Sequence, residues 1–367
     1  MSLKFDLVFE GGGAKGIVFV GALQALEEKK YEYRRLIGTS AGAISAVLCA
    51  AGYNSNELLE AVNQRTPNGK PIFTTFMDRP KASDFSQEIR DNSVSMQAFA
   101  KVPLVSFFRG KLLDFLLDNP LFARQFSFIE CGGFYSGNTF LNWIGERLKQ
   151  KEFDPGITLL EFYNKTQKDL SLVATNVTKQ RLMVLNHRTA PNLPVARAVR
   201  MSMSIPFVWQ EVTWDSVWGN YLPIKEPVIG SKIVDGGVLS NFPMNLIAET
   251  NHAGDVMGEN LTVNFVNAAE NLGLLIDESK PVSGQPATVH NTKLIDDLPT
   301  IGRIHKIAET MMSARDNSII DKYRQQICFL PAQGYGTLEF DMDETRRDAL
   351  ITAGKKATFE HLAVRGF

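Results

Sequence analysis

Cysteine is scarce in this chain, and that scarcity excludes two kinds of small stabilised domain. Only three cysteines occur among 367 residues, at Cys49, Cys131 and Cys328. They are too scattered for a disulfide framework, and they lack the close pairs of a zinc site. The sequence therefore predicts a protein of a reducing compartment.

An excess of charge of one sign is also missing. Lysine and arginine number 39 against 40 aspartates and glutamates, which gives a formal net charge of −1. That balance excludes an overall basic footprint for a nucleic-acid polymer. No apolar run approaches the roughly 18 residues that span a bilayer. The N-terminal residues lack a basic region followed by an apolar stretch, so we expect no secretory signal and a cytoplasmic location.

Strand and helix patterns alternate at the start of the chain. Residues 4–10 alternate as a strand, and residues 17–28 have the apolar period of a helix. A second strand at 33–37 precedes a helix at 43–51 that is apolar on every side. This order predicts an α/β fold of three layers, with a mostly parallel central sheet between helices, formed by one domain over residues 1–367.

Alternation is interrupted by an insertion at about 66–134, rich in proline and phenylalanine. We interpret it as a helical segment over one face of the sheet and as a candidate lid. Its apolar stripe comprises Leu112, Leu113, Leu116 and Leu117 beside Phe107 and Phe108. The stripe could contact lipid or pack on the core, and the sequence does not decide between them.

Strand patterns resume after the insertion, at 170–175, 181–186, 232–234, 261–266 and 326–330. A surface loop is predicted at 278–291, and a last helix begins near Asp343. The part from about 270 onward is less diagnostic than the rest.

The segment Gly38-Thr39-Ser40-Ala41-Gly42 has the pattern G-x-S-x-G between a strand and an apolar helix. A sharp turn of this kind holds a serine hydroxyl clear of the sheet, and the following helix directs its positive end at the reaction site. Small residues such as Gly38 and Gly42 allow the close approach of the backbone. Ser40 is therefore a candidate nucleophile, and a purely structural turn is the alternative.

A glycine loop, Gly11-Gly12-Gly13-Ala14-Lys15-Gly16, follows the first strand. It matches the dinucleotide fingerprint G-x-G-x-x-G, but the acidic residue expected at the end of the second strand is missing. The P-loop pattern also fails. A third interpretation is an oxyanion hole, in which backbone N–H groups of Gly11, Gly12, Gly13 and Ala14 point at one spot.

Asp235 ends a strand and is followed by Gly236 and Gly237. By itself Asp-Gly is a common turn, but beside the two other motifs it becomes a candidate base. A Ser-His-Asp esterase would need a histidine, and none of the five stands in a distinctive setting: His187, His252, His290, His305 and His361. A Ser–Asp dyad and a triad both stay open.

The order of these motifs resembles the patatin-like phospholipase family, in a bacterial, intracellular form. A fourth similar block runs from Arg200 to Phe207, although Met201 replaces the usual alanine and the phenylalanine is displaced. Lys15 stands where many members have arginine. The resemblance covers roughly residues 4–265.

The resemblance implies that Ser40 attacks an ester carbonyl while Asp235 takes its proton. The oxyanion would rest on the Gly11–Ala14 loop, and an acyl-enzyme would form and be hydrolysed. Lys15 would support the loop or face an anionic head group, with Gly16, Gly38, Gly42, Gly236 and Gly237 supporting the turns. No metal or organic cofactor is required, and the substrate would be a membrane phospholipid or other glycerolipid, reached by transient membrane contact.

Two other classes of function compete with this hydrolase. One is a dinucleotide-binding protein that uses the Gly11–Gly16 loop, and the other is a catalytically silent scaffold. The resemblance also allows either housekeeping lipid turnover or a regulated membrane-degrading effector, delivered without a conventional signal peptide. The sequence identifies neither a small-molecule activator nor a homo-oligomer.

Overall fold

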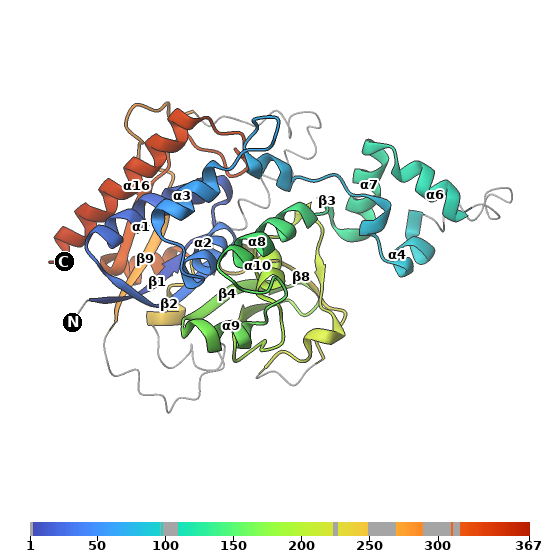
Figure 1. Cartoon of the computed structure of the whole chain (residues 1–367), viewed down its shortest axis with the longest axis horizontal. Coiled ribbons are helices and arrows are strands. Elements are labelled where there is room, and N and C mark those ends of the chain that lie inside the picture. Colours follow the sequence, from blue (N-terminus) through green and yellow to red (C-terminus); the bar gives the residue numbers. More distant parts are fainter. Residues whose placement is uncertain are drawn as a thin grey trace.

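The computed structural model describes residues 3–95, 97, 109–222, 227–248, 269–288, 310 and 316–367. Figure 1 shows a central sheet with helices on both sides and a group of helices set apart from this body. The sheet is mostly parallel, so the predicted fold class is confirmed.

The main sheet contains eight strands among the described residues, in the order β10-β9-β1-β2-β4-β8-β7, with β5 paired to β4. Their bounds are β1 Lys4–Phe9, β2 Glu32–Thr39, β4 Asp169–Asn176, β5 Arg181–Leu185, β7 Val212–Thr213, β8 Lys232–Asp235, β9 Glu270–Asp277 and β10 Ile327–Pro331. The pairings from β10 to β4 are parallel, whereas β5 and β8 are antiparallel to β4, and β7 to β8. A separate parallel pair joins β3 (Gly133–Tyr135) to β6 (Phe207–Trp209).

Helices and short 3₁₀ turns connect these strands. The helices are α1 Val18–Glu28, α2 Ala41–Ala50, α3 Ser55–Asn63, α4 Gln87–Asn92, α6 Arg109–Leu117, α7 Pro120–Cys131, α8 Asn138–Gln150, α9 Leu159–Thr166, α10 Val195–Ser202, α11 Asn245–Ala248, α15 Asn317–Lys322 and α16 Glu344–Val364. The 3₁₀ turns that bear on the site are η1 Gly13–Ile17, η2 Ile72–Phe76 and η5 Gly236–Val238. Among the described helices, none has the length and apolar character that crossing a membrane requires.

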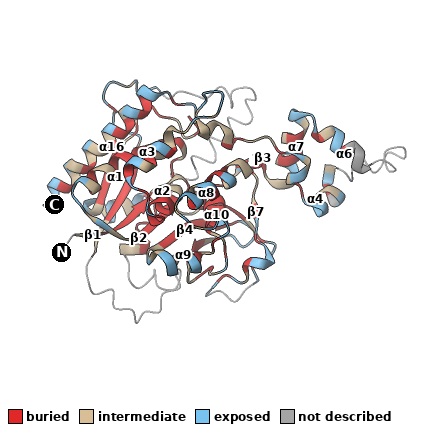
Figure 2. Cartoon of the chain, viewed as in Figure 1, coloured by how far each residue is buried: buried red, intermediate tan, exposed pale blue. Residues whose placement is uncertain are grey.

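The alternation of β1 divides the core between the two faces of the sheet. Phe5, Leu7 and Phe9 belong to the larger apolar cluster with α1, α2 and α16, as the period-2 pattern predicts. Val8 belongs to a smaller cluster on the other face, which includes Leu246 of α11. Figure 2 shows buried residues concentrated in the strands of the sheet and in α1 and α2 beside it. Helix α2 therefore begins directly after a buried residue, Ser40.

Most predicted strands are present, and one central strand was not predicted. The strands expected at 170–175, 181–186, 232–234 and 326–330 correspond to β4, β5, β8 and β10, whereas the one expected at 261–266 lies outside the described residues. Strand β9 was missed, although its residues 270–274 pair in parallel with β1. Its run Leu272–Ile276 carries the apolar signal of a buried strand, but such short runs are ambiguous.

Helices α4, α6 and α7 form a separate module within the insertion. Figure 1 places them beside the main body and away from both chain ends, so these three helices do not take the position over one face of the sheet that was predicted for the insertion. The module has its own small core, to which the predicted stripe contributes Leu113 and Leu117, both at most 2% exposed. Phe107, Phe108 and the side chain of Leu112 lie outside what the structure describes. The inward half of the stripe therefore packs on the module.

Candidate active site

Ser40 stands in a strained turn between β2 and α2. Its backbone angles are φ 54° and ψ −121°, in a region that residues with a Cβ rarely adopt. Close packing maintains the turn, because a Cβ on Gly42 would lie 2.3 Å from the carbonyl oxygen of Phe9. Gly38, at the other end of the motif, lies in β2 directly before Thr39. This is the geometry of a nucleophile at a strand–helix elbow.

The register of the sheet brings Asp235 next to Ser40. Thr39, the last residue of β2, pairs with Val173 in β4, and the next residue of β4, Ala174, pairs with Asp235. Both candidate residues thus lie at the same edge of the sheet, although 195 positions separate them in the sequence.

The surroundings of Asp235 make its carboxyl a stronger base than a free aspartate. The residue is fully buried, and this burial raises its pKa to about 7, partly offset by the Ser40 hydroxyl and the Gly237 N–H. Oδ1 accepts a hydrogen bond of 2.8 Å from the Gly237 N–H. Oδ2 has no fully formed hydrogen bond in the described part of the chain, so the contact with Ser40 is looser than a standard hydrogen bond, as is common in unliganded active sites. A carboxyl with a pKa near neutrality suits general base catalysis.

The block from Arg200 to Phe207 braces the two candidate residues. Ser202 accepts a hydrogen bond of 3.0 Å from the Ser40 N–H and donates one of 2.6 Å to the Val173 carbonyl. The Ser204 carbonyl accepts a bond of 2.9 Å from the Asp235 N–H. The buried Arg200 guanidinium contacts the Ser204 hydroxyl. The fourth motif therefore has a defined positioning role that its sequence did not reveal.

The glycine loop lies against the nucleophile. A Cβ on Gly11 would lie 3.1 Å from the Ser40 Cβ. Two of the four predicted oxyanion donors are already engaged, since the Gly11 N–H donates to Asn241 O at 3.0 Å and the Ala14 N–H donates to Thr337 O at 2.7 Å. Within the described residues the N–H groups of Gly12 and Gly13 have no hydrogen-bond partner. Of the four predicted donors, the N–H groups of Gly12 and Gly13 are thus the ones available to a ligand.

Asn241 holds the loop in place, and sequence reasoning missed it. Besides accepting from the Gly11 N–H, it donates from Nδ2 to the Gly11 carbonyl at 3.0 Å and to Glu10 Oε1 at 3.3 Å. Asp316 in turn accepts from the Asn241 and Phe242 N–H groups at 2.8 and 2.6 Å. The only signal was that Asn241 lies six residues after Asp235. The carboxyl that accepts from Asn241 is that of Glu10, and its burial raises its pKa to about 8.

The remaining predicted residues lie in or beside these turns. Lys15 is buried and forms an ion pair with Glu278, so its charge is already compensated. Gly16 lies in η1 against Ala41, while Gly236 and Gly237 form η5 directly after Asp235. Among the residues that the structure describes, no group of three or more His, Cys, Asp or Glu side chains is arranged to hold a metal ion.

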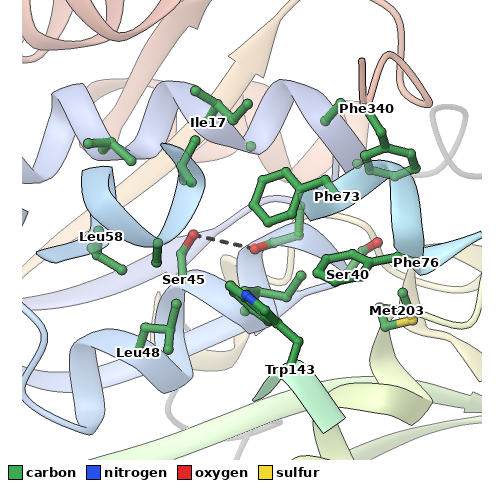
Figure 3. Close-up of a pocket in the computed structure, with 18 of the residues that line it drawn as sticks. Ile17, Ser40, Ser45, Leu48, Leu58, Phe73, Phe76, Trp143, Met203 and Phe340 are labelled. Atoms are coloured by element: carbon green, nitrogen blue, oxygen red, sulfur yellow. Dashed lines mark hydrogen bonds between the residues drawn. The ribbon is translucent and has the colours of Figure 1, made fainter. Parts of the chain in front are cut away.

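An apolar cavity with a volume of about 90 Å³ begins at Ser40. Helix α2 forms one wall, α1 and α3 form another, and an aromatic group covers it. In that group Phe76 packs on Phe73 and Trp143 with ring centroids 5.2 and 5.4 Å apart. Figure 3 shows Ser40 at one end beside Phe76 and Met203, with Leu48 and Leu58 at the opposite end. Such a cavity can hold a hydrocarbon chain next to the nucleophile.

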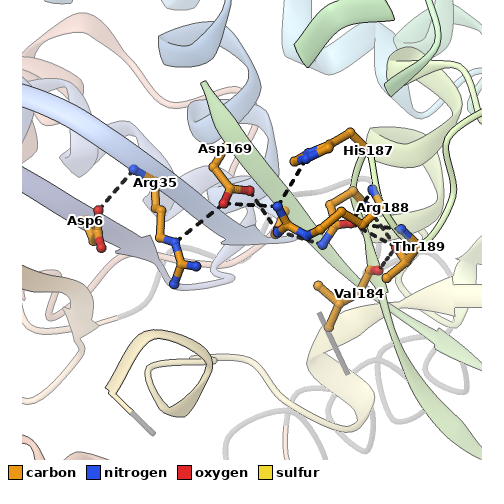
Figure 4. A network of polar contacts seen from close by, with 9 residues as sticks. Asp6, Arg35, Asp169, Val184, His187, Arg188 and Thr189 are labelled. Atoms are coloured by element: carbon orange, nitrogen blue, oxygen red, sulfur yellow. Dashed lines mark hydrogen bonds and ion pairs between the residues drawn. The ribbon is translucent and has the colours of Figure 1, made fainter. Parts of the chain in front are cut away.

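The described histidines lie away from this site. His187 stacks on Tyr163 and borders the network of Asp6, Arg35, Asp169 and Arg188 (Figure 4). Arg35, in the middle of β2, pairs in register with Asp169, the first residue of β4. His361 lies in the last turn of α16. His252, His290 and His305 lie outside the described residues.

The fold is of the α/β class, and its site places a serine in a strained turn at the end of a parallel strand. The family model of the patatin-like phospholipases matches residues 7–247. The chain belongs to this family, and it is a lipid hydrolase.

Curated relatives and a solved structure resemble the chain to different degrees. The uncharacterized protein YqhO of Bacillus subtilis is 30% identical over 97% of both chains. A probable lipid hydrolase, 463L of Invertebrate iridescent virus 6, is 22% identical over 65% of this chain and 62% of its own. The crystal structure of VipD from Legionella pneumophila covers 99% of this chain and 67% of that one, with 16% identity and a TM-score of 0.49. The dinucleotide-binding and silent-scaffold alternatives gain no support from these findings.

Proposed function

We propose that this protein is a serine acyl-hydrolase that releases fatty acids from ester-linked membrane glycerolipids by a Ser40–Asp235 dyad. One observation carries the proposal. Ser40 occupies a strained elbow beside a buried carboxyl and at the end of an apolar cavity. A triacylglycerol lipase of Saccharomyces cerevisiae, 24% identical over 66% of this chain and 22% of its own, supports an ester substrate.

The proposed reaction has two steps. The Ser40 hydroxyl attacks the ester carbonyl, and its proton passes to Asp235. The N–H groups of Gly12 and Gly13 stabilise the oxyanion, and a preorganised donor of this kind contributes about 3–4 kcal/mol to catalysis. The alcohol leaves with the proton from Asp235. Water, deprotonated by Asp235, then attacks the acyl-enzyme, and Ser40 recovers its proton as the fatty acid departs.

The first experiment measures fatty-acid release from mixed phospholipid vesicles. We expect Ser40→Ala to abolish release, because loss of a nucleophilic serine costs on the order of 10⁶-fold in kcat in a comparable system. We expect Asp235→Asn to lower release by several orders of magnitude. Covalent labelling of Ser40 by a fluorophosphonate separates an idle but assembled site from a wrong assignment, in which neither labelling nor release would occur.

A second set of variants tests the dyad against a triad. We expect alanine at His252, His290 or His305 to leave ester hydrolysis within a few-fold of the wild type, because the proposal gives no histidine a chemical step. Loss of activity in one of these variants, with the fold intact by circular dichroism, would assign a triad instead. His187→Ala is the matched control, since His187 contacts Arg188 and Tyr163, away from Ser40.

A further inference from the structure

The apolar cavity runs along helix α2, so its length can be measured along the axis of that helix. Four residues of this helix follow Ser40 along the cavity wall, and they are Ala41, Ile44, Ser45 and Leu48. Their spacing keeps them on one side of the helix. The Ser45 hydroxyl is bonded at 3.4 Å to the Ala41 carbonyl, so it presents no free donor to the cavity. Helix α2 thus offers a continuous apolar track that leads away from the nucleophile.

The far end of this track is closed by residues from three helices. Leu48 of α2, Leu58 and Ala61 of α3, and Leu23 of α1 line the cavity there, and each is at most 5% exposed. In Figure 3 Leu48 and Leu58 stand across the cavity from Ser40. A chain that enters at Ser40 would therefore meet a wall rather than solvent.

This end wall is anchored to the rest of the protein. Helix α3 begins with a capping box formed by Asn54 and Glu57. Its first residue, Ser55, donates from its N–H and its hydroxyl to Glu27 of α1, at 2.8 and 2.5 Å. These bonds fix α3 against α1, so the wall is expected to retain its position when a ligand enters.

The track can be compared with a hydrocarbon chain. Ser40 and Leu48 are about 12 Å apart along the helix axis at ~1.5 Å per residue. An extended chain of about 8–10 carbon atoms spans that length, since each C–C bond of ~1.5 Å advances by less than its own length in a zigzag.

We infer that Leu48 and Leu58 set the acyl-chain length that the cavity favours, about 8–10 carbons by the same helical measure, so that the longer chains of membrane lipids are cleaved more slowly than chains of this length. This inference rests on the proposed function, because it takes Ser40 as the point where the acyl carbonyl is bound. Leu48 and Leu58 are specificity-determining residues in this scheme, and neither takes part in the chemistry.

The test uses a series of soluble p-nitrophenyl esters with chains from four to sixteen carbons. We expect kcat/KM of the wild type to peak near the inferred length. Leu58→Ala should move the peak to longer chains, raising the ratio of the twelve-carbon to the eight-carbon rate by on the order of tenfold, as for pockets that discriminate by one or two methylenes. Ala61→Leu should move the peak to shorter chains.

Ratios between esters are independent of the fraction of folded enzyme, so they separate specificity from stability. Leu26→Ala is the matched control, because it truncates a buried leucine of α1 that does not line the cavity, and we expect its profile to follow the wild type. If Ser40→Ala retains the hydrolysis, the proposed function fails. If hydrolysis depends on Ser40 but Leu58→Ala and Ala61→Leu both keep the wild-type profile, only the chain-length inference is overturned.

Discussion

The backbone of Ser40 stores conformational strain at the point where chemistry is proposed. A non-glycine residue at φ 54° costs of order 1–3 kcal/mol and persists only when its surroundings enforce it. Here the Ser40 N–H is held by Ser202, which is itself anchored on Val173 of β4. The strained residue is thus tied to the sheet from two sides, through its own strand and through α10.

The pH dependence of hydrolysis follows from the burial of Asp235. Asp235 acts as a base only when ionised, and burial raises its pKa to about 7. We therefore expect kcat/KM on a soluble ester to rise with pH up to about 7 and then to level off, with a loss approaching tenfold per pH unit on the acid side. Steady-state kinetics between pH 5 and 9 checks this.

Burial also raises the pKa of a second carboxyl, Glu10, to about 8, which lies within the pH range of this assay. The matched control is Glu10→Gln. Its kcat/KM should still fall below about pH 7, because Glu10 contacts Asn241 and Ile276 rather than Ser40. If the fall in kcat/KM on the acid side disappeared in Glu10→Gln, the titrating group would be Glu10 and not Asp235.

At the scale of elements, the helical module formed by α4, α6 and α7 exposes large apolar side chains on its outer face. Its inner face packs around Phe85, Leu113 and Phe126, whereas Phe115 and Ile129 are 73% and 61% exposed. Large exposed apolar side chains are unfavourable in water and suit contact with a lipid surface. We propose that the transient membrane contact that the proposed substrate requires occurs through this outer face.

We expect Phe115→Glu to lower fatty-acid release from phospholipid vesicles several-fold while hydrolysis of a soluble ester stays at the wild-type rate. The reason is that a charge opposes insertion into the interface and does not touch the site. Vesicle co-sedimentation and both assays measure the effect. Val364→Glu, at an 88% exposed apolar position of α16, should change neither. An equal loss on vesicles and on the soluble ester would contradict membrane contact through Phe115.

At the scale of the whole molecule, the site depends on contacts between distant parts of the chain. Asp316 accepts from the N–H groups of Asn241 and Phe242, and Asn241 holds the glycine loop. We expect Asp316→Ala to lower kcat on a soluble ester by about one to two orders of magnitude and to destabilise the fold, since each unpaired buried N–H costs about 1–3 kcal/mol.

Asp316→Asn keeps an acceptor oxygen and should restore most of the activity, which a general loss of folding would not predict. Asp114→Ala is the remote control, because it removes only an ion pair with Arg90 in the helical module. The rate of fluorophosphonate labelling should likewise be lowest in Asp316→Ala, higher in Asp316→Asn and unchanged in Asp114→Ala. Wild-type rates in Asp316→Ala would mean that this residue does not position the loop.

The motifs near strand ends could be predicted because they combine local pattern with turn chemistry. Ser40, Asp235 and the glycine loop are recognisable from a few adjacent residues each. Asn241 and Asp316 could not be found this way, since their roles arise only when residues 75 positions apart meet. Strand β9 was missed for a related reason, as its apolar run resembles a buried helix segment until β1 is placed beside it.

The order of the strands also determines how much of the chain must be synthesised before the site can assemble. Strand β1 needs β9 as its second neighbour, and the glycine loop is closed by Asn241 and Thr337. At about 5–20 residues per second, Thr337 leaves the ribosome roughly 15–60 s after Ser40. During that interval the growing chain carries its nucleophile without the backbone that positions the glycine loop. A polypeptide that ends before Thr337 therefore lacks contacts that position the proposed site, and we expect lipid cleavage only from the completed protein.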